Sequence, residues 1–261
     1  MIDTHTHLYV SQFDEDRATV IQRAVEAGVG QFFLPNIDST SIDAMLELER
    51  QYPQRCFAMM GLHPCSVQSN VEEELAIVKQ WLDRRAFVAV GEIGLDLYWD
   101  KTFFEEQKMA FRTQIGWAKA LDVPIVIHSR DSTQEVIDIL RDEQDERLRG
   151  IFHCFGGSVE EANAITALGF YLGIGGVATF KKSGLDKTLT EVDLKHLVLE
   201  TDSPYLAPTP YRGKRNESSY LRLVAEKIAA VQKISVAEVE RVTTENAQTI
   251  FQMKAEQQVI L

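Results

Sequence analysis

Phe87-Val88-Ala89-Val90-Gly91-Glu92 is a short apolar run that predicts a buried strand, and a segment with a different period follows it. Over residues 103–121 the apolar side chains recur at spacings of three and four, which predicts an amphipathic helix. A second apolar run, Pro124-Ile125-Val126-Ile127-His128, comes directly after this helix. A strand, a helix and a second strand in this order predict parallel pairing with a right-handed crossover.

The same alternation of short apolar runs and longer helical segments continues along the whole chain. Ala18, Ile21, Ala24 and Val25 form one helical face, and it ends before Gly28, a residue suited to terminate a helix. A last helix is predicted over 236–251. Eight strand–helix units in 261 residues favour one domain, residues 1–261, folded as a closed (β/α)8 barrel of TIM type rather than as an open doubly wound sheet. The eight predicted strands are Met1–His5, Gln31–Pro35, Cys56–Leu62, Phe87–Glu92, Pro124–His128, Gly150–His153, Phe170–Ile174 and Leu197–Thr201.

Composition and charge restrict the class of protein. With 45% hydrophobic and 25% charged residues, the chain has the composition of a globular protein with a large core. The 27 Lys and Arg against 39 Asp and Glu leave a net charge of −12, which argues against a protein that coats nucleic acid with a basic surface. A nuclease stays compatible with this charge, because bound metal ions would neutralise phosphates locally.

The cysteines and the first residues predict a cytoplasmic protein. Cys56, Cys65 and Cys154 form no Cys-x-x-Cys pair, which is typical of reduced thiols. We interpret Cys154 as a buried thiol on the strand face opposite to His153. The segment 1–5 lacks the basic and apolar regions of a signal peptide, and no apolar run is long enough for a membrane span. We therefore expect no membrane and no obligate protein partner.

Most histidines fall at the carboxyl ends of the predicted strands, where barrels of this type keep their active sites. Three carboxylates fall at the same ends. The desolvation free energy of burying so many polar side chains at one mouth would be prohibitive unless a cation bound them. These side chains are His5, His7, His63, His128 and His153 together with Glu92, Glu200 and Asp202.

The number of candidate ligands indicates two divalent ions rather than one, since a single catalytic zinc usually takes three protein ligands. We assign His5, His7 and Asp202 to one ion, His128 and His153 to the other, and Glu92 to both as a bridge. Zn, Mn and Mg all remain open, because imidazoles and carboxylates together do not select one metal.

Each of these residues also has a simpler interpretation. A lone His-x-His is a weak signal, and Glu92 on its own could be a buried ion-pair partner, although Gly91 and Gly94 beside it suggest a closely packed backbone. His63 is equally compatible with an active-site donor and with a hydrogen bond across the barrel mouth. Asp96 fits an acceptor behind the ligands, or a turn residue, better than a ligand.

A basic loop follows the last predicted strand. Arg212, Lys214 and Arg215 are three cations in four positions, close after Tyr205. Because loops after the last strands of these barrels often hold phosphate, we expect this loop to bind substrate phosphates. The alternative is a solvated turn whose cations pair with Glu217 or the next helix.

The chain resembles the TatD family of metal-dependent hydrolases and DNases over essentially its whole length. Many members carry an acidic residue where this chain has Tyr9, and the loop Leu34–Asp38 lacks the family's glycine. Neither departure removes a ligand. The matching motifs are Asp3–Leu8, Gly61–Pro64, Gly91–Asp96, Ile127–Asp131, His153–Gly157, Leu199–Pro208, Arg212–Asn216 and Asn246–Phe251.

The resemblance implies a divalent-metal hydrolase that cleaves DNA phosphodiesters, with 3′→5′ exonuclease action on a single strand or a duplex end. It implies the ligand set His5, His7, Glu92, His128, His153 and Asp202. We expect Asp202 and Glu92 to act on the attacking water, and His63, Arg130, Tyr205, Arg212 and Lys214 to contact substrate. The alternatives are an amidohydrolase-type enzyme acting on a small ester, lactone or amide, and a metal-stabilised scaffold without turnover.

Overall fold

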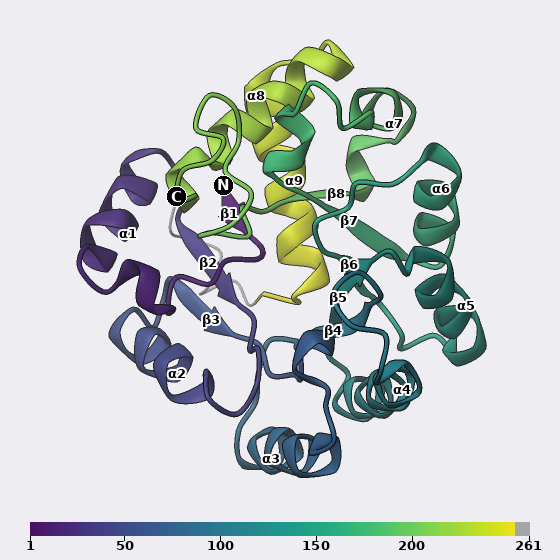
Figure 1. The fold of residues 1–261 in the computed structure, drawn as a ribbon. Coiled ribbons are helices and arrows are strands. Elements are labelled where there is room, and N and C mark those ends of the chain that lie inside the picture. The colour runs from purple at the N-terminus through teal and green to yellow at the C-terminus, as the bar shows by residue number, and fades with distance from the viewer. Residues whose placement is uncertain (254–261) are drawn as a thin grey trace.

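The computed structural model describes residues 1–253 as a ring of eight parallel strands surrounded by helices (Figure 1). The predicted single domain over 1–261 includes eight residues, 254–261, that lie outside the described part. The strands are β1 Ile2–Asp3, β2 Gln31–Leu34, β3 Cys56–Ala58, β4 Val90–Asp96, β5 Ile125–Arg130, β6 Gly150–Phe152, β7 Phe170–Ile174 and β8 Leu197–Leu199. The α-helices are α1 Arg17–Glu26, α2 Ile42–Gln51, α3 Val71–Arg84, α4 Phe104–Leu121, α5 Thr133–Glu143, α6 Val159–Ala167, α7 Leu185–Glu191, α8 Leu221–Gln232 and α9 Val236–Ile250.

All strand pairs are parallel and follow chain order, from β1 to β3 and from β4 to β8. Backbone hydrogen bonds join the two groups at both seams. Val88 N donates to Ala58 O at 3.3 Å beside β3, and Thr4 N donates to Leu199 O at 3.0 Å between the ends of β1 and β8. The predicted α/β fold, with parallel strands in chain order and a helix after each strand, is confirmed.

Five strands, β1, β2, β3, β6 and β8, end earlier than predicted. Of these, β1, β6 and β8 stop directly before a polar residue, namely Thr4, His153 and Glu200. β4 and β5 instead run past their predicted ends, from Glu92 to Asp96 and from His128 to Arg130. The pairing register of β4 and β5 shifts between Gly91 and Ile93, so Glu92 lies at an irregularity within the strand.

The barrel interior is filled by apolar side chains on the amino-terminal side of the predicted site residues. Val126, Ile151 and Val198 are among them, each two residues before a polar residue on the same strand face. The end of α9 covers this interior, where Phe251 stacks on Phe33 with ring centroids 3.9 Å apart. This packed floor leaves His128, His153 and Glu200 at the opposite, open end.

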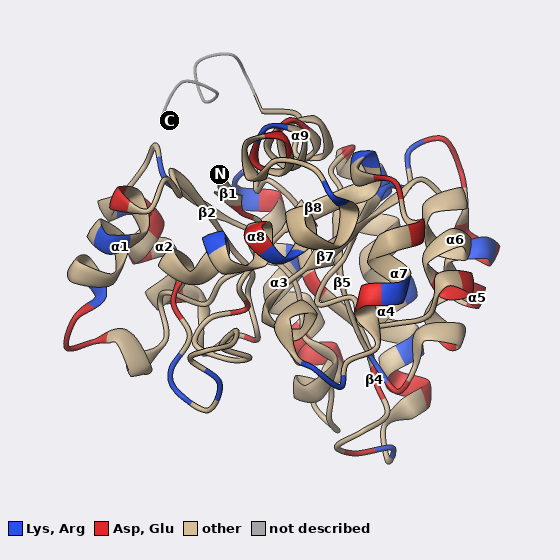
Figure 2. Cartoon of the chain, turned by 90° about the horizontal axis from the view of Figure 1, so that it is seen from above, with Lys and Arg blue, Asp and Glu red and all other residues tan. Residues whose placement is uncertain are grey.

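The outer helices bury one face each against the strands and expose a mixed charged face. In α1 the buried residues are Val20, Ile21 and Ala24, so the predicted face was wrong in including Ala18, which is exposed. Gly28 has φ +86° just after the helix, as expected for its terminator. Figure 2 shows acidic and basic residues interspersed on α1, α7 and α9 rather than gathered in one basic face. In residues 1–253 no helix combines the length and the apolar character that crossing a membrane requires.

Candidate metal centre

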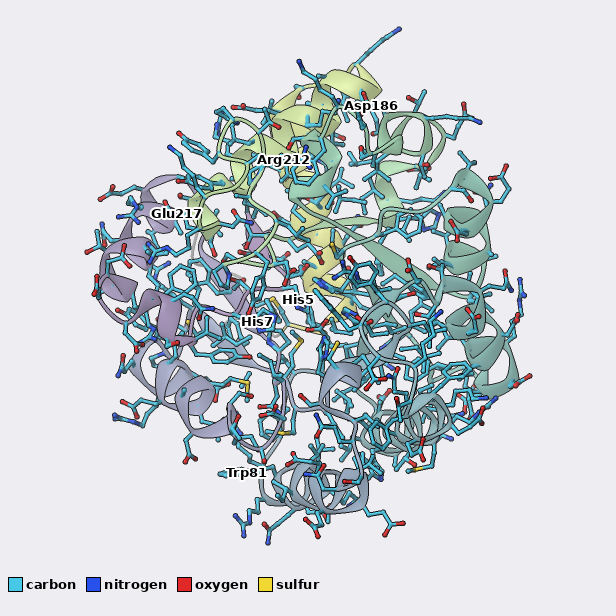
Figure 3. All side chains as sticks on the ribbon, viewed as in Figure 1. His5, His7, Trp81, Asp186, Arg212 and Glu217 are labelled. Atoms are coloured by element: carbon cyan, nitrogen blue, oxygen red, sulfur yellow. The ribbon has the colours of Figure 1, made fainter. Side chains whose placement is uncertain are left out.

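The Glu92 carboxylate lies at the centre of a ring of imidazoles at the open end of the barrel. It comes from β4, its side chain is only 2% exposed, and its two oxygens face different histidines. Oε2 lies 3.1 Å from His5 Nε2 and 3.7 Å from His7 Nε2. Oε1 lies 3.0 Å from His128 Nδ1, 3.3 Å from His63 Nε2 and 3.7 Å from His153 Nε2. Figure 3 shows His5 and His7 near the centre of the barrel. The geometry therefore has the division expected of a bridging carboxylate.

Asp202 is the second carboxylate of the cluster, and it reaches the histidines from the segment after β8. Its Oδ1 lies 3.5 Å from His7 Nε2, 3.8 Å from His5 Nε2 and 3.9 Å from His153 Nε2. Its backbone N–H donates to His5 O at 2.9 Å, which ties it to the end of β1. The Asp202 side chain is 14% exposed, so it lies nearer to the mouth than Glu92 does.

The residues present fit divalent metal ions. His5 Nδ1 is buried without a hydrogen-bond partner in the described chain, Nε2 faces only the Glu92 and Asp202 carboxylates without a well-directed hydrogen bond, and the ring stacks on His153 with centroids 3.5 Å apart. Unpartnered buried nitrogens and closely stacked imidazoles are costly unless a cation binds them. Five groups of side chains have ligand atoms within 4.8 Å of one another, and three of them consist of predicted ligands alone, namely His5–His7–Glu92, His5–His153–Asp202 and Glu92–His128–His153. How these ligands divide between two ions stays a prediction.

A layer of acceptors behind the ligands orients the imidazoles. His153 Nδ1 lies 2.9 Å from Glu200 Oε1, and His128 Nε2 lies 2.8 Å from Asp96 Oδ2. The other nitrogen of each ring then points toward Glu92, as expected for metal-binding histidines. Sequence reasoning placed Glu200 at this end of the barrel without giving it a role. Its position two residues after Val198, on the inner face of β8, was the available signal.

Charge within the cluster shifts the pKa values of its buried ligands in different directions. Burial alone would lower the pKa of His153, but Glu200, Glu92 and Asp202 together raise it to about 10. Burial likewise opposes ionisation of Glu92, yet the nearby imidazoles of His63, His5 and His153 hold its pKa well below the ordinary value. A metal ion that binds the His153 ring must displace its proton, so we expect metal binding to be coupled to proton release.

His63 and Asp96 both serve as hydrogen-bonding groups in this structure. His63 Nδ1 accepts from Cys65 N at 3.0 Å, which leaves its Nε2–H to face Glu92 Oε1. Asp96 Oδ1 accepts from Tyr98 N and Trp99 N, while Oδ2 faces His128. The interpretation of Asp96 as an acceptor and turn residue matches this geometry.

The cations predicted to hold phosphate separate into two groups. Arg215 binds both oxygens of Asp16 at 2.7 and 2.8 Å and donates to Gln12 O, so the inclusion of Arg215 was wrong. Arg212 and Lys214 are exposed, and Arg212 lies over the Phe180 ring at 4.4 Å. Figure 3 shows Arg212 on the side of the barrel opposite to α3.

Two further predicted contacts lie at the same mouth. Tyr205 is half-exposed, with its ring centroid 6.0 Å from that of His7. Arg130 is exposed at the end of β5, with its guanidinium over the Tyr98 ring at 3.8 Å. Both positions are compatible with a substrate that reaches the histidines from outside.

The interpretation of Cys154 as a buried strand residue was wrong. β6 ends at Phe152, and Cys154 is half-buried in the left-handed region with φ +49°. Its N–H donates to Glu200 Oε1 at 2.6 Å. Asp131 and Asp202 take the same left-handed conformation after β5 and β8, so backbone strain is concentrated around the site. Within the described residues all three cysteines are free thiols.

Replacing Tyr9 by Phe is expected to weaken binding of one metal ion by about 10- to 100-fold, the effect of losing a group that orients a ligand. The Tyr9 hydroxyl donates to Pro35 O and therefore accepts from His7 Nδ1 at 2.9 Å, which directs His7 Nε2 into the cluster. Calorimetric titration of chelator-stripped protein measures the affinity. Tyr171→Phe, which removes a hydroxyl from β7, is the matched control. Equal affinities in the two variants would contradict this role for Tyr9.

The chain is similar in sequence and fold to known metal-dependent hydrolases. The family model described as TatD related DNase matches residues 2–252. The chain is 41% identical to the uncharacterized metal-dependent hydrolase YabD of Bacillus subtilis, over 97% of this chain and 99% of that protein. It is 32% identical to the 3′-5′ ssDNA/RNA exonuclease TatD of Yersinia pseudotuberculosis, over 97% of this chain and all of that protein. The crystal structure of the TatD homologue YjjV from Escherichia coli superposes with a TM-score of 0.92 at 31% identity, covering 97% of this chain and 98% of that one.

Proposed function

We propose that this chain, which belongs to the family of TatD-related DNases, cleaves the phosphodiester bonds of DNA. The family makes the chain a metal-dependent hydrolase that acts on ester bonds. We further propose that two divalent ions, Zn, Mn or Mg, occupy the cluster. The observation that carries the proposal is the division of the Glu92 oxygens between two sets of imidazoles. We also propose that the protein is cytoplasmic, because its three cysteines are free thiols, as is typical of proteins in a reducing compartment.

Each part of the site has a distinct task in this reaction. Metal ions bound here would neutralise the phosphoryl oxygens and acidify a water. His5, His7, His128 and His153 would hold the ions through ring nitrogens, His153 after losing its proton, and Glu92 faces both sets of imidazoles. Asp202 is the carboxylate nearer to the mouth, so it accepts the proton of the attacking water. Arg130, Arg212 and Lys214 hold phosphate oxygens at the rim, and His63 and Tyr205 contact the substrate between them.

A product-resolved assay tests the proposal. Purified protein is incubated with end-labelled single-stranded DNA, duplex DNA and RNA, each with Mg²⁺, Mn²⁺ or Zn²⁺. We expect mononucleotides released from the 3′ end, as the name of the Yersinia relative suggests. An Asp202→Asn preparation controls for contaminating nucleases. Hydrolysis of small esters, lactones or amides without DNA cleavage would favour the amidohydrolase-type alternative, and no turnover with any metal would favour a scaffold.

Replacing Arg212 and Lys214 together by Ala is expected to raise KM for DNA about 10-fold or more and to weaken its salt dependence, because two phosphate contacts are lost. The rate on a small phosphodiester should not change. Arg215→Ala is the matched control on the same loop, since its ion pair with Asp16 is structural. It should lower the free energy of unfolding by about 1 kcal/mol and leave KM unchanged. An effect on KM from Arg215→Ala alone would contradict the separation of the two groups.

A further inference from the structure

Two aromatic side chains are exposed on the loop that follows β4, beside the metal centre. Trp99 is 70% exposed and Tyr98 is 52% exposed, and their rings meet edge to face at 4.9 Å. Trp99 is the most exposed large hydrophobic side chain among residues 1–253. Exposing so much apolar area is unfavourable in an isolated protein, so a cluster of this kind often marks a binding site.

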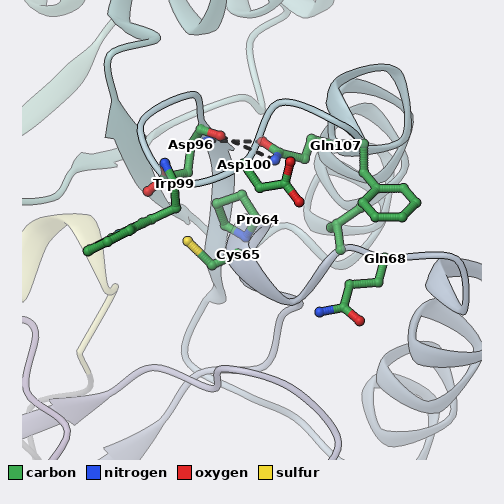
Figure 4. Close-up of a pocket in the computed structure, with 9 residues that line it drawn as sticks. Pro64, Cys65, Gln68, Asp96, Trp99, Asp100 and Gln107 are labelled. Carbon is green, nitrogen blue, oxygen red and sulfur yellow. Dashed lines mark hydrogen bonds between the residues drawn. The ribbon is translucent and has the colours of Figure 1, made fainter.

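The loop is fixed in place by the carboxylate that also faces a candidate metal ligand. Asp96 Oδ1 accepts from the N–H groups of Tyr98 and Trp99 at 3.0 and 3.1 Å, and its Oδ2 faces His128 Nε2. The Gln107 side chain, from α4, bonds to both Asp96 N and Asp96 O (Figure 4). The aromatic rings are therefore held at a defined place beside the centre.

Arg130 completes the surface formed by Tyr98 and Trp99, which we call the aromatic platform. Its guanidinium lies 3.8 Å from the Tyr98 ring centroid and 5.2 Å from that of Trp99. The Arg130 side chain is exposed. Within residues 1–253 its guanidinium contacts these two rings and forms no ion pair with a carboxylate. A guanidinium that lies on aromatic rings keeps its N–H groups available to a phosphate.

A cavity of about 310 Å³ opens directly beside the platform. Figure 4 shows Trp99 on one side and Asp100 and Gln107 on the other, with Pro64 and Cys65 beneath. This volume lies at the lower end of small-molecule pockets. Phe103 and Pro64 give it apolar walls, while the Gln68 amide and the Asp100 carboxylate offer donors and acceptors. The exposed Asp100 disfavours a phosphate inside the cavity and suits a neutral group with hydrogen-bond donors.

We propose that the aromatic platform and this cavity bind an unpaired nucleobase of a single-stranded nucleic acid, while Arg130 binds the adjoining phosphate. The inference rests on the proposed function and specifies its substrate. A base in a duplex has both faces covered by its neighbours, so an open indole selects bases that are unstacked. Because every base has an aromatic face, the platform should accept all four.

Fluorescence tests the platform without any turnover. The chain has three tryptophans, so Trp81→Phe combined with Trp117→Phe leaves Trp99 as the single indole. This protein is titrated with a phosphorothioate-linked oligothymidine, which resists cleavage. We expect the oligonucleotide to quench Trp99 emission, and neither an abasic oligomer of equal length nor a blunt duplex should do so. Equal quenching by the abasic oligomer would overturn the proposal.

Kinetics provides the second test. Trp99→Ala should raise KM for single-stranded DNA between about 5-fold and about 150-fold, the range measured for one stacked base, and Trp99→Phe should restore most of the loss. Trp81→Ala is the matched control. It also removes an indole whose ring is covered by a guanidinium, that of Arg84, but Trp81 lies on α3 at the outer surface of the barrel (Figure 3). It should leave KM unchanged.

Hydrolysis of methyl p-nitrophenyl phosphate, a diester without a base, separates the two proposals. Trp99→Ala should cleave it at the wild-type rate. If wild-type protein cleaves DNA and Trp99→Ala has an unchanged KM, the platform is refuted and the proposed function stands. If wild-type protein cleaves no nucleic acid, the proposed function fails, and base-dependent quenching alone decides the platform.

Discussion

Replacing Glu92 by Gln is expected to lower kcat by about 10³-fold or more and to reduce the bound metal to at most one ion per chain. An amide is neutral and has one oxygen, so it cannot face His5 and His128 with negative charge at the same time. The carboxylate does so now, with Oε2 3.1 Å from His5 Nε2 and Oε1 3.0 Å from His128 Nδ1. Elemental analysis of dialysed protein measures the stoichiometry, and steady-state assays measure kcat.

Glu200→Gln is the matched control, because Glu200 is also buried but lies behind His153 rather than between the imidazole sets. It should weaken metal binding by about 10- to 100-fold and keep a stoichiometry of two at saturating metal. A Glu92→Gln protein that retained two ions and full activity would refute the bridging role. Loss of metal without any measurable wild-type turnover would instead support the scaffold alternative.

The candidate centre was accessible from the sequence because its residues follow a simple geometric rule. Parallel strands of a barrel all end at one mouth, so a polar residue after each apolar run must meet the others there. His5, His128 and His153 were predicted together on that basis, and they lie together around Glu92. No side-chain detail was required, only the count of strands and their direction.

Partners that join distant loops were not accessible in the same way. Arg215 was grouped with Arg212 because the two are neighbours in sequence, but its guanidinium binds Asp16, which is 199 positions away. Nothing in a local pattern shows which acidic residue a loop will meet. The Trp99 platform was missed for a related reason, since exposure follows from packing around Asp96 and Gln107. The adjacent pair Tyr98-Trp99, directly before the polar residues Asp100, Lys101 and Thr102, was the available signal.

Replacing Gly94 by Ala is expected to lower the free energy of unfolding by about 3 kcal/mol or more. Gly94 has φ +140°, a conformation that L side chains rarely adopt, and a Cβ there would collide with the backbone carbonyl of His128. Because backbone must move to relieve this contact, β4 and β5 would separate where Glu92 and His128 approach each other. Urea denaturation measures the stability, and titration with metal measures the accompanying loss of affinity.

Substitutions at two other glycines, Gly28 and Gly156, are the reference points for the loss of stability expected from Gly94→Ala. Gly28 also has positive φ, +86°, but no atom lies within 4 Å of an added Cβ, so Gly28→Ala should cost about 1 kcal/mol from backbone strain alone. Gly156 has no such conformation and has space for a methyl group, so Gly156→Ala should be close to neutral. The part of the Gly94→Ala effect that exceeds Gly28→Ala combines the collision with His128 and the greater backbone strain at φ +140°. Equal stability of these two variants would show that β4 and β5 tolerate the methyl group, and that the close approach of their backbones does not set the position of Glu92.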